Sequence, residues 1–104
     1  MNKQLTHGGA DTLVATATIT TGGGDEWLLN YYIQQFVGTE ELKDIPLYGL
    51  RIDKSTPDGV LAEREETLAV TENHALIMEM AQAFAKGQVT PVVLLEMTDD
   101  WLQC

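Results

Sequence analysis

The side chains that could do chemistry in this sequence are mainly carboxylates, which form two clusters. Their members are Glu63, Glu65 and Glu66 in the first cluster and Glu96, Asp99 and Asp100 in the second. Paired carboxylates can hold a hard cation or act as the acid and base of a hydrolysis reaction. The alternating acids and central glycine of a calcium-binding EF-hand loop are missing from both clusters. We therefore expect both clusters to be solvated acidic surface that is available to a protein partner.

Nucleophilic and metal chemistry lack the residue sets that they need. His7, Gly8 and Gly9 are similar to the oxyanion loop of some hydrolases, but the chain has no G-x-S-x-G motif and its only serine is Ser55. His74 has no second histidine at helical spacing and no cysteine pair to complete a zinc or iron site. The sequence therefore predicts no catalytic residue, no metal site and no cofactor, and we expect the protein not to be an enzyme.

Three consecutive glycines at residues 22–24 raise a choice between a phosphate-binding loop and a turn. A phosphate loop needs glycines at set spacings and then the start of a helix, whose free N–H groups hold the anion. Here Asp25 and Glu26 follow, which would repel phosphate, and after them comes a second β-like run. Glycine also supplies the positive φ that a hairpin requires. We therefore predict a turn between two strands.

Four runs have the alternation or the β-branched and aromatic content of strands. They lie at residues 10–21, 27–37, 47–55 and 60–70. Between the last two, the sequence Thr-Pro-Asp-Gly at residues 56–59 predicts a β-turn. The fourth run has acidic residues on both of its sides, so we predict that it is an edge strand.

A helix is predicted over residues 71–87, with Thr71 as its N-cap and Gly87 as its stop. Its apolar stripe follows the spacing i, i+3, i+4, i+7 and consists of Ile77, Met80, Ala81 and Phe84. Beyond it, Thr90 and Pro91 are typical of a second helix start. A second stripe would then consist of Leu94, Met97 and Trp101. Val92 and Leu95 lie off that stripe, so a short buried strand at residues 91–96 remains the alternative.

Segregated strands and helices predict an α+β fold. We expect one domain over residues 1–104, with a four-stranded antiparallel, meander-like sheet followed by one or two C-terminal helices packed on one face. The first nine residues are polar and glycine-rich, and we expect them to be flexible.

Aromatic residues gather in the second predicted strand. Trp27, Tyr31, Tyr32 and Phe36 lie within ten residues and fall on both faces of that strand, and Trp101 lies near the end of the chain. Packing into the core explains such a cluster. Burial of one face by a partner also explains it, and a second copy of this chain is one candidate.

The charge of the chain is strongly acidic, with a formal net charge of −10. Residues 57–104 hold only Arg64 and Lys86 as basic residues. This balance disfavours direct binding to nucleic acid or to an anionic membrane, and it favours solubility or a basic protein partner. No apolar stretch is long enough to span a membrane, no secretory signal is present, and Cys104 is the single cysteine. We therefore expect a cytoplasmic protein.

The second half of the chain resembles a family of short, uncharacterised bacterial proteins that is defined only as a domain of unknown function. The resemblance covers about residues 48–102 and is carried by "YGLRI", "TENHALIMEMAQAFAKGQVTPV" and "DDWL". These motifs are structural, so no catalytic residue is transferred with them. The resemblance implies a bacterial or bacteriophage cytosolic origin and no assigned activity.

Three functional hypotheses follow. The leading one is a non-enzymatic binding or regulatory protein that acts through protein–protein contact. Its contact residues would belong to the aromatic strand or to the acidic C-terminal half: Trp27, Tyr31, Tyr32, Phe36, Glu63, Glu65, Glu96, Asp99, Asp100 and Trp101. The alternative is a phage-type inhibitor that mimics nucleic-acid charge and blocks a basic groove. The third, a small hydrolase, lacks both a nucleophile and a metal set.

Overall fold

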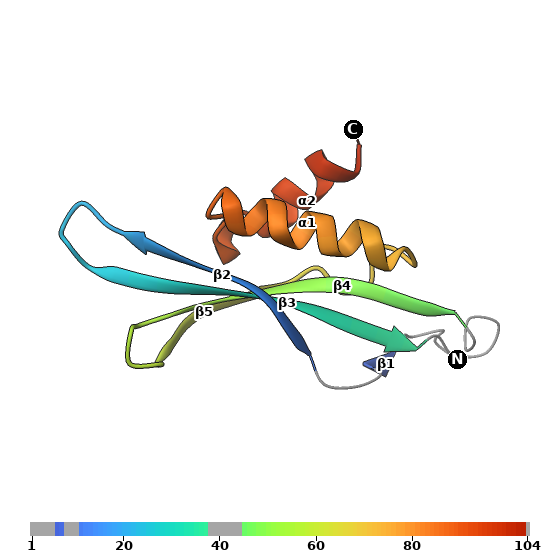
Figure 1. Ribbon diagram of the computed structural model, residues 1–104, viewed down its shortest axis with the longest axis horizontal. Helices are drawn as coiled ribbons and strands as arrows, with labels where there is room; N and C mark the ends of the chain where they lie inside the picture. Colours follow the sequence, from blue (N-terminus) through green and yellow to red (C-terminus); the bar gives the residue numbers. More distant parts are fainter. Residues whose placement is uncertain (1–5, 8–10, 38–44, 104) are drawn as a thin grey trace.

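The computed structural model describes residues 6–7, 11–37 and 45–103 of the chain. In chain order the elements are β1 (Thr6–His7), β2 (Thr12–Thr20), β3 (Glu26–Val37), β4 (Pro46–Ser55), β5 (Leu61–Glu66), α1 (His74–Lys86), the 3-10 helix η2 (Pro91–Val93) and α2 (Leu94–Leu102). The strands form one antiparallel sheet, and both α-helices lie on the same side of it (Figure 1). The predicted α+β fold is confirmed.

The sheet is a meander in which β2, β3, β4 and β5 pair in sequence order. The two-residue strand β1 pairs with the end of β3, on the edge that β2 also uses. β1 lies within the segment that we expected to be flexible, and the rest of residues 1–9 lies outside the described residues. Because most pairs join neighbours along the chain, local turn chemistry sets much of the topology.

Both predicted turns are confirmed. The Thr21 N–H donates to the Asp25 carbonyl at 2.8 Å, and Gly24 adopts the positive φ of +89° that closes the β2–β3 hairpin. In the β4–β5 hairpin the Gly59 N–H donates to the Thr56 carbonyl at 2.9 Å, and Gly59 has a φ of +95°. Glycine is the residue that reaches this region without steric cost, so the sequence marks both hairpins.

The core lies between the sheet and the helices. Strand alternation directs one side of β3 and β4 towards the helices, and the stripe of α1 covers it. The buried residues include Leu29, Tyr31, Ile33, Leu50, Ile52, Ile77, Met80, Ala81, Phe84 and Leu94. Burying a large apolar side chain is worth about 1.5–3 kcal/mol, so this layer contributes most of the favourable free energy of folding.

The core contains the hydroxyl group of Tyr31, which is hydrogen-bonded there. Tyr31 is fully buried, and its hydroxyl donates to the Val89 carbonyl at 2.7 Å. Burial raises the pKa of the Tyr31 phenol above its ordinary value, because the charged form would lose its hydration. The bond joins the centre of the sheet to the loop between α1 and η2.

The start of α1 differs from the prediction by a few residues. Asn73, not Thr71, is the N-cap, and its side chain accepts from the Leu76 N–H at 3.1 Å. Thr71 cannot begin the helix because its carbonyl accepts from the Tyr48 N–H at 2.7 Å, which extends the sheet. The predicted stop is confirmed, since Gly87 is the C-cap of α1.

The second helix is present, so the strand alternative for residues 91–96 is wrong. Pro91 opens η2, and α2 follows it directly. Leu94 is fully buried as the stripe predicts, and Trp101 packs partly against the core. The prediction for Met97 is wrong, because it is 37% exposed and Thr98, at 3%, takes the inward position.

The fourth strand is shorter than predicted, because β5 ends at Glu66 instead of continuing to residue 70. Leu68 has a φ of +60°, which interrupts the extended backbone. Pairing then resumes beyond it, where the Val70 N–H donates to the Tyr48 carbonyl at 2.8 Å. Within the described residues β5 pairs only with β4, which agrees with its predicted edge position.

Candidate protein-binding surface

The aromatic residues of β3 divide between the two faces of the sheet and do not form one surface. Tyr31 is fully buried under the helices, and Phe36 on the opposite face is 6% exposed. Tyr32 shares the face of Phe36, and the Arg51 guanidinium lies 3.9 Å from the centre of its ring. Trp27 is half-buried on the helix side, with the Lys54 ammonium 4.7 Å from its ring centre. Stacking of cations on these two rings covers part of their area.

The helix-free face of the sheet carries a polar cluster centred on Asp53. This carboxylate is 7% exposed and accepts from Arg64 Nε at 2.8 Å and from Arg64 Nη2 at 3.0 Å. It also accepts from Arg51 Nη2 at 3.2 Å. The hydrogen bond to Asp53 raises the pKa of Arg64 above its ordinary value. The guanidinium groups of Arg51 and Arg64 therefore both lie on the helix-free face.

Gln34 extends the same cluster across the sheet. Its side-chain amide donates to Asp11 at 3.2 Å and to Glu66 at 2.6 Å, and Arg51 also bonds Asp11. The sequence analysis did not predict this cluster. Its members come from different strands, so only the register brings them together. Glu66 belongs to this cluster and points away from Glu63 and Glu65.

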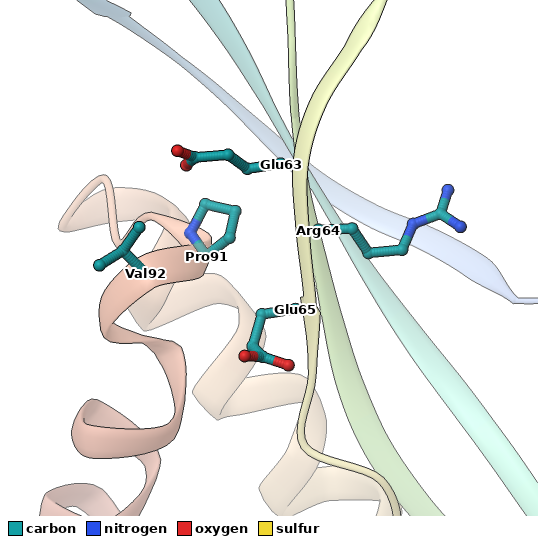
Figure 2. A pocket seen from close by; sticks show the side chains of 5 residues that line it. All are labelled: Glu63, Arg64, Glu65, Pro91 and Val92. Atoms are coloured by element: carbon teal, nitrogen blue, oxygen red, sulfur yellow. The ribbon is translucent and has the colours of Figure 1, made fainter.

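A small open pocket of about 240 Å³ lies between β5 and η2, lined by Glu63, Arg64, Glu65, Pro91 and Val92. Figure 2 shows Glu63 and Glu65 on the side of β5 that faces Pro91 and Val92, and Arg64 directed to the opposite side of the strand. The Glu65 carboxylate turns back to its own strand, where it accepts from the Glu66 N–H at 3.0 Å. The register explains this arrangement, because Glu65 pairs with the core residue Ile52 and therefore shares the helix side of the sheet. Two carboxylates thus border an apolar wall formed by η2.

The positive charges beside this pocket are few among the described residues. Lys54 Nζ lies 3.8 Å from Glu63 Oε1, and the Glu63 side chain is 41% exposed. The Arg64 side chain bonds Asp53 on the other face. The helix side of β5 therefore carries two partly exposed carboxylates.

The outward side of α2 continues this surface with both apolar and acidic residues. Val92, Leu95 and Leu102 are 77%, 49% and 40% exposed. Asp99 follows Val92 by seven residues, so the two share one side of the helix. Exposed carboxylates border the apolar residues, namely Glu96, Asp99 and Asp100. We call the α2–β5 surface the set formed by Glu63, Glu65, Val92, Leu95, Glu96, Asp99, Asp100 and Leu102.

Metal-ligating side chains do not gather into a cluster in the part of the chain that the structure describes. No group of three or more histidine, cysteine, aspartate or glutamate side chains among them could hold a metal ion. His74 is exposed, and its ring lies edge-on to Tyr48 at 5.0 Å between centroids. Gly8 and Gly9 lie outside the described residues. Of the helices in the described ranges, none has the length and apolarity needed to cross a membrane.

The chain was also compared with known proteins. The model of a family of unknown function, DUF6514, matches residues 10–104. This match is longer than the resemblance over residues 48–102, and it includes all of the described sheet except β1. The searches of curated proteins and of solved structures found no match. Because the family model covers nearly the whole sequence, the chain belongs to the DUF6514 family of unknown function.

Proposed function

We propose that the protein is a non-enzymatic binding protein that holds a basic, amphipathic segment of a partner protein on the α2–β5 surface. The observation that carries the proposal is the exposure of Val92, at 77%, beside a pocket bordered by Glu63 and Glu65. An apolar side chain so exposed loses the benefit of burial unless a partner covers it.

The shape of the surface supports an extended or helical segment as the ligand. Val92, Leu95 and Leu102 lie along one helix side over three turns, which suits apolar residues repeated along a partner segment. The pocket beside Val92 would take one anchoring side chain. Anchors of this kind carry most of the free energy of binding at an interface.

The charges of the surface support a basic ligand. Glu63, Glu65, Glu96, Asp99 and Asp100 border the apolar residues, while Arg51 and Arg64 bond Asp53 on the opposite face. Carboxylates around an apolar centre steer lysine and arginine side chains into place and repel acidic competitors.

Binding of synthetic peptides tests the proposal. Fluorescence anisotropy would compare a basic amphipathic peptide with two relatives, one with glutamate at the lysine positions and one with serine at the apolar positions. We expect only the basic amphipathic peptide to bind well. Leu95→Ser should weaken that binding about tenfold or more. Glu79→Gln, an exposed position on α1, is the matched control and should leave it unchanged.

Salt separates this proposal from charge mimicry of nucleic acid. Apolar anchoring leaves substantial binding at high ionic strength, whereas purely ionic binding is screened. If the serine peptide binds as well as the amphipathic one and both are lost at high salt, the surface acts through charge alone and the proposal fails. Equal binding of the glutamate peptide would contradict it as well.

A further inference from the structure

Strand β2 is an uncharged edge in a strongly acidic chain. Within the described residues it pairs with β3 alone, and residues 12–24 contain no charged side chain. The opposite edge strand, β5, carries Glu63, Arg64, Glu65 and Glu66 among its six residues. Charged side chains are a usual protection of sheet edges against pairing with other chains, and β2 lacks them.

The hairpin determines which residues of β2 direct their backbone N–H and C=O groups towards β3 and which direct them away from it. The Thr21 N–H donates to the Asp25 carbonyl, so this pair closes the ladder next to the turn. In an antiparallel ladder the bonded pairs alternate, so Ala17 and Ile19 bond β3. The backbone groups of Thr16, Thr18 and Thr20 therefore point away from the sheet.

A side-chain hydrogen bond agrees with this outward direction of the Thr18 backbone. Gln88, in the loop after α1, donates from Nε2 to the Thr18 carbonyl at 2.8 Å. The Thr18 carbonyl is therefore directed outward and accepts a donor from outside the ladder. Figure 1 shows that the β2–β3 hairpin extends beyond the helices, so the end of β2 near the turn is not covered by them.

We propose that two copies of the chain associate through β2, with the strands antiparallel about a two-fold axis at Thr18. Thr18 would then face the partner's Thr18, and Thr16 would face the partner's Thr20. All of these positions have outward backbone groups, so each pair can exchange N–H···O bonds in the manner of a ladder once the Gln88 side chain leaves the Thr18 carbonyl. The two sheets would become one continuous sheet.

The absence of charge favours a second copy as the occupant. Two chains with a net charge of −10 repel each other over most of their surfaces, and residues 12–24 let them meet along a stretch that holds no carboxylate. A two-fold axis makes the same edge complementary to itself and closes the assembly at two chains. The exposed threonine side chains would form cross-strand pairs on one face. β2 and β5 lie at opposite edges of the sheet, so the inference does not depend on the proposed function of the α2–β5 surface.

The test is the molar mass of the full chain by sedimentation over a range of concentrations, with three variants. We expect a reversible dimer. Thr18→Pro removes an outward N–H that the ladder to β3 does not use, and it should weaken the dimer about tenfold or more. Thr18→Lys, which adds an edge charge without changing the backbone, should do the same. Thr18→Val keeps the N–H and should stay dimeric.

Amide hydrogen exchange provides a second readout that does not depend on any variant. The N–H groups of Thr16, Thr18 and Thr20 should exchange more slowly as the protein concentration rises. Those of Ala17 and Ile19, bonded to β3, should change little. A monomer at all concentrations overturns the inference, as does a dimer that Thr18→Lys leaves intact or whose protection appears elsewhere.

Discussion

The carbonyl oxygen of Leu68 lies directly over Gly49, at a point where a Cβ atom on Gly49 would be 1.8 Å from it. Leu68 reaches this position with a φ of +60°. Thr67 holds the crossing in place, because its hydroxyl oxygen accepts from the Leu50 N–H at 2.9 Å and its hydroxyl donates to the Leu68 carbonyl at 2.7 Å. The chain therefore leaves β5 by passing over the one residue of β4 that has no side chain.

Gly49→Ala should be among the most damaging single substitutions in the protein. The added methyl group cannot coexist with the Leu68 carbonyl, so backbone must move, and we expect the free energy of unfolding to fall by about 3 kcal/mol or more. Urea denaturation followed by circular dichroism measures it. Gly22→Ala is the control, because a Cβ at Gly22 meets nothing within 4 Å. Equal effects of the two substitutions would contradict the geometry.

The Tyr31 hydroxyl should give the protein a dependence on alkaline pH. Burial raises the pKa of Tyr31 in the folded state, so the folded protein binds this proton more tightly than the unfolded chain. The contribution is complete below the ordinary tyrosine pKa of about 10 and is lost as the pH rises towards the folded pKa. Between about pH 10 and the folded pKa we expect the free energy of unfolding to fall by up to about 1.4 kcal/mol per pH unit.

Tyr31→Phe provides the comparison for that experiment. It leaves the Val89 carbonyl without its donor, so stability at neutral pH should fall by about 1–2 kcal/mol. The fall above pH ~10 should become shallower than in the parent protein. Denaturation at several pH values checks both effects. An unchanged slope in Tyr31→Phe would show that another group causes the alkaline loss.

Alanine substitutions at the two adjacent leucines at the start of α2 should lower the stability by very different amounts. Leu94 is fully buried and Leu95 is 49% exposed. Leu94→Ala should lower the free energy of unfolding by about 2–5 kcal/mol through the cavity that it leaves. Leu95→Ala should cost less than about 1 kcal/mol. Thermal denaturation of the two variants measures the difference, and a reversed order would mean that α2 presents its other side to the core.

Asp53→Asn should weaken the polar cluster on the helix-free face. The substitution removes the negative charge shared by Arg51 and Arg64, whose side chains are 15% and 45% exposed. Because these groups are only partly shielded from water, we expect a loss of about 1–3 kcal/mol. Glu79→Gln, on the exposed side of α1, should change the free energy of unfolding by less than about 0.5 kcal/mol in the same assay. If Asp53→Asn left the free energy of unfolding unchanged, the Asp53 charge would add nothing to stability.

Local patterns in the sequence predicted much of the fold. Gly24 and Gly59 mark the two hairpins because each turn requires a positive φ within a few residues of chain. The stripe of Ile77, Met80 and Phe84 predicted which side of α1 is buried, since helical spacing alone determines that side. The hairpins and the buried side of α1 can be predicted from residues that are close together in the chain.

Features that depend on distant residues were missed or misplaced. Thr71 looked like an N-cap, but its carbonyl bonds Tyr48, which lies more than twenty residues earlier in the chain. The cluster around Asp53 requires the registers of β3, β4 and β5 together. Alternation placed Tyr31 and Tyr32 on opposite faces of β3 but could not tell which face the helices cover.

The order of the elements along the chain has a consequence for synthesis in the cell. The strands precede both helices, so the apolar side of the sheet, with Leu29, Leu50 and Ile52, leaves the ribosome before α1 and α2 exist to cover it. Neighbouring strands can pair early because their contacts are local. The nascent chain therefore presents an uncovered apolar sheet until its last third is made. Because uncovered apolar surface promotes aggregation, we expect the nascent chain to be most prone to aggregate during that interval.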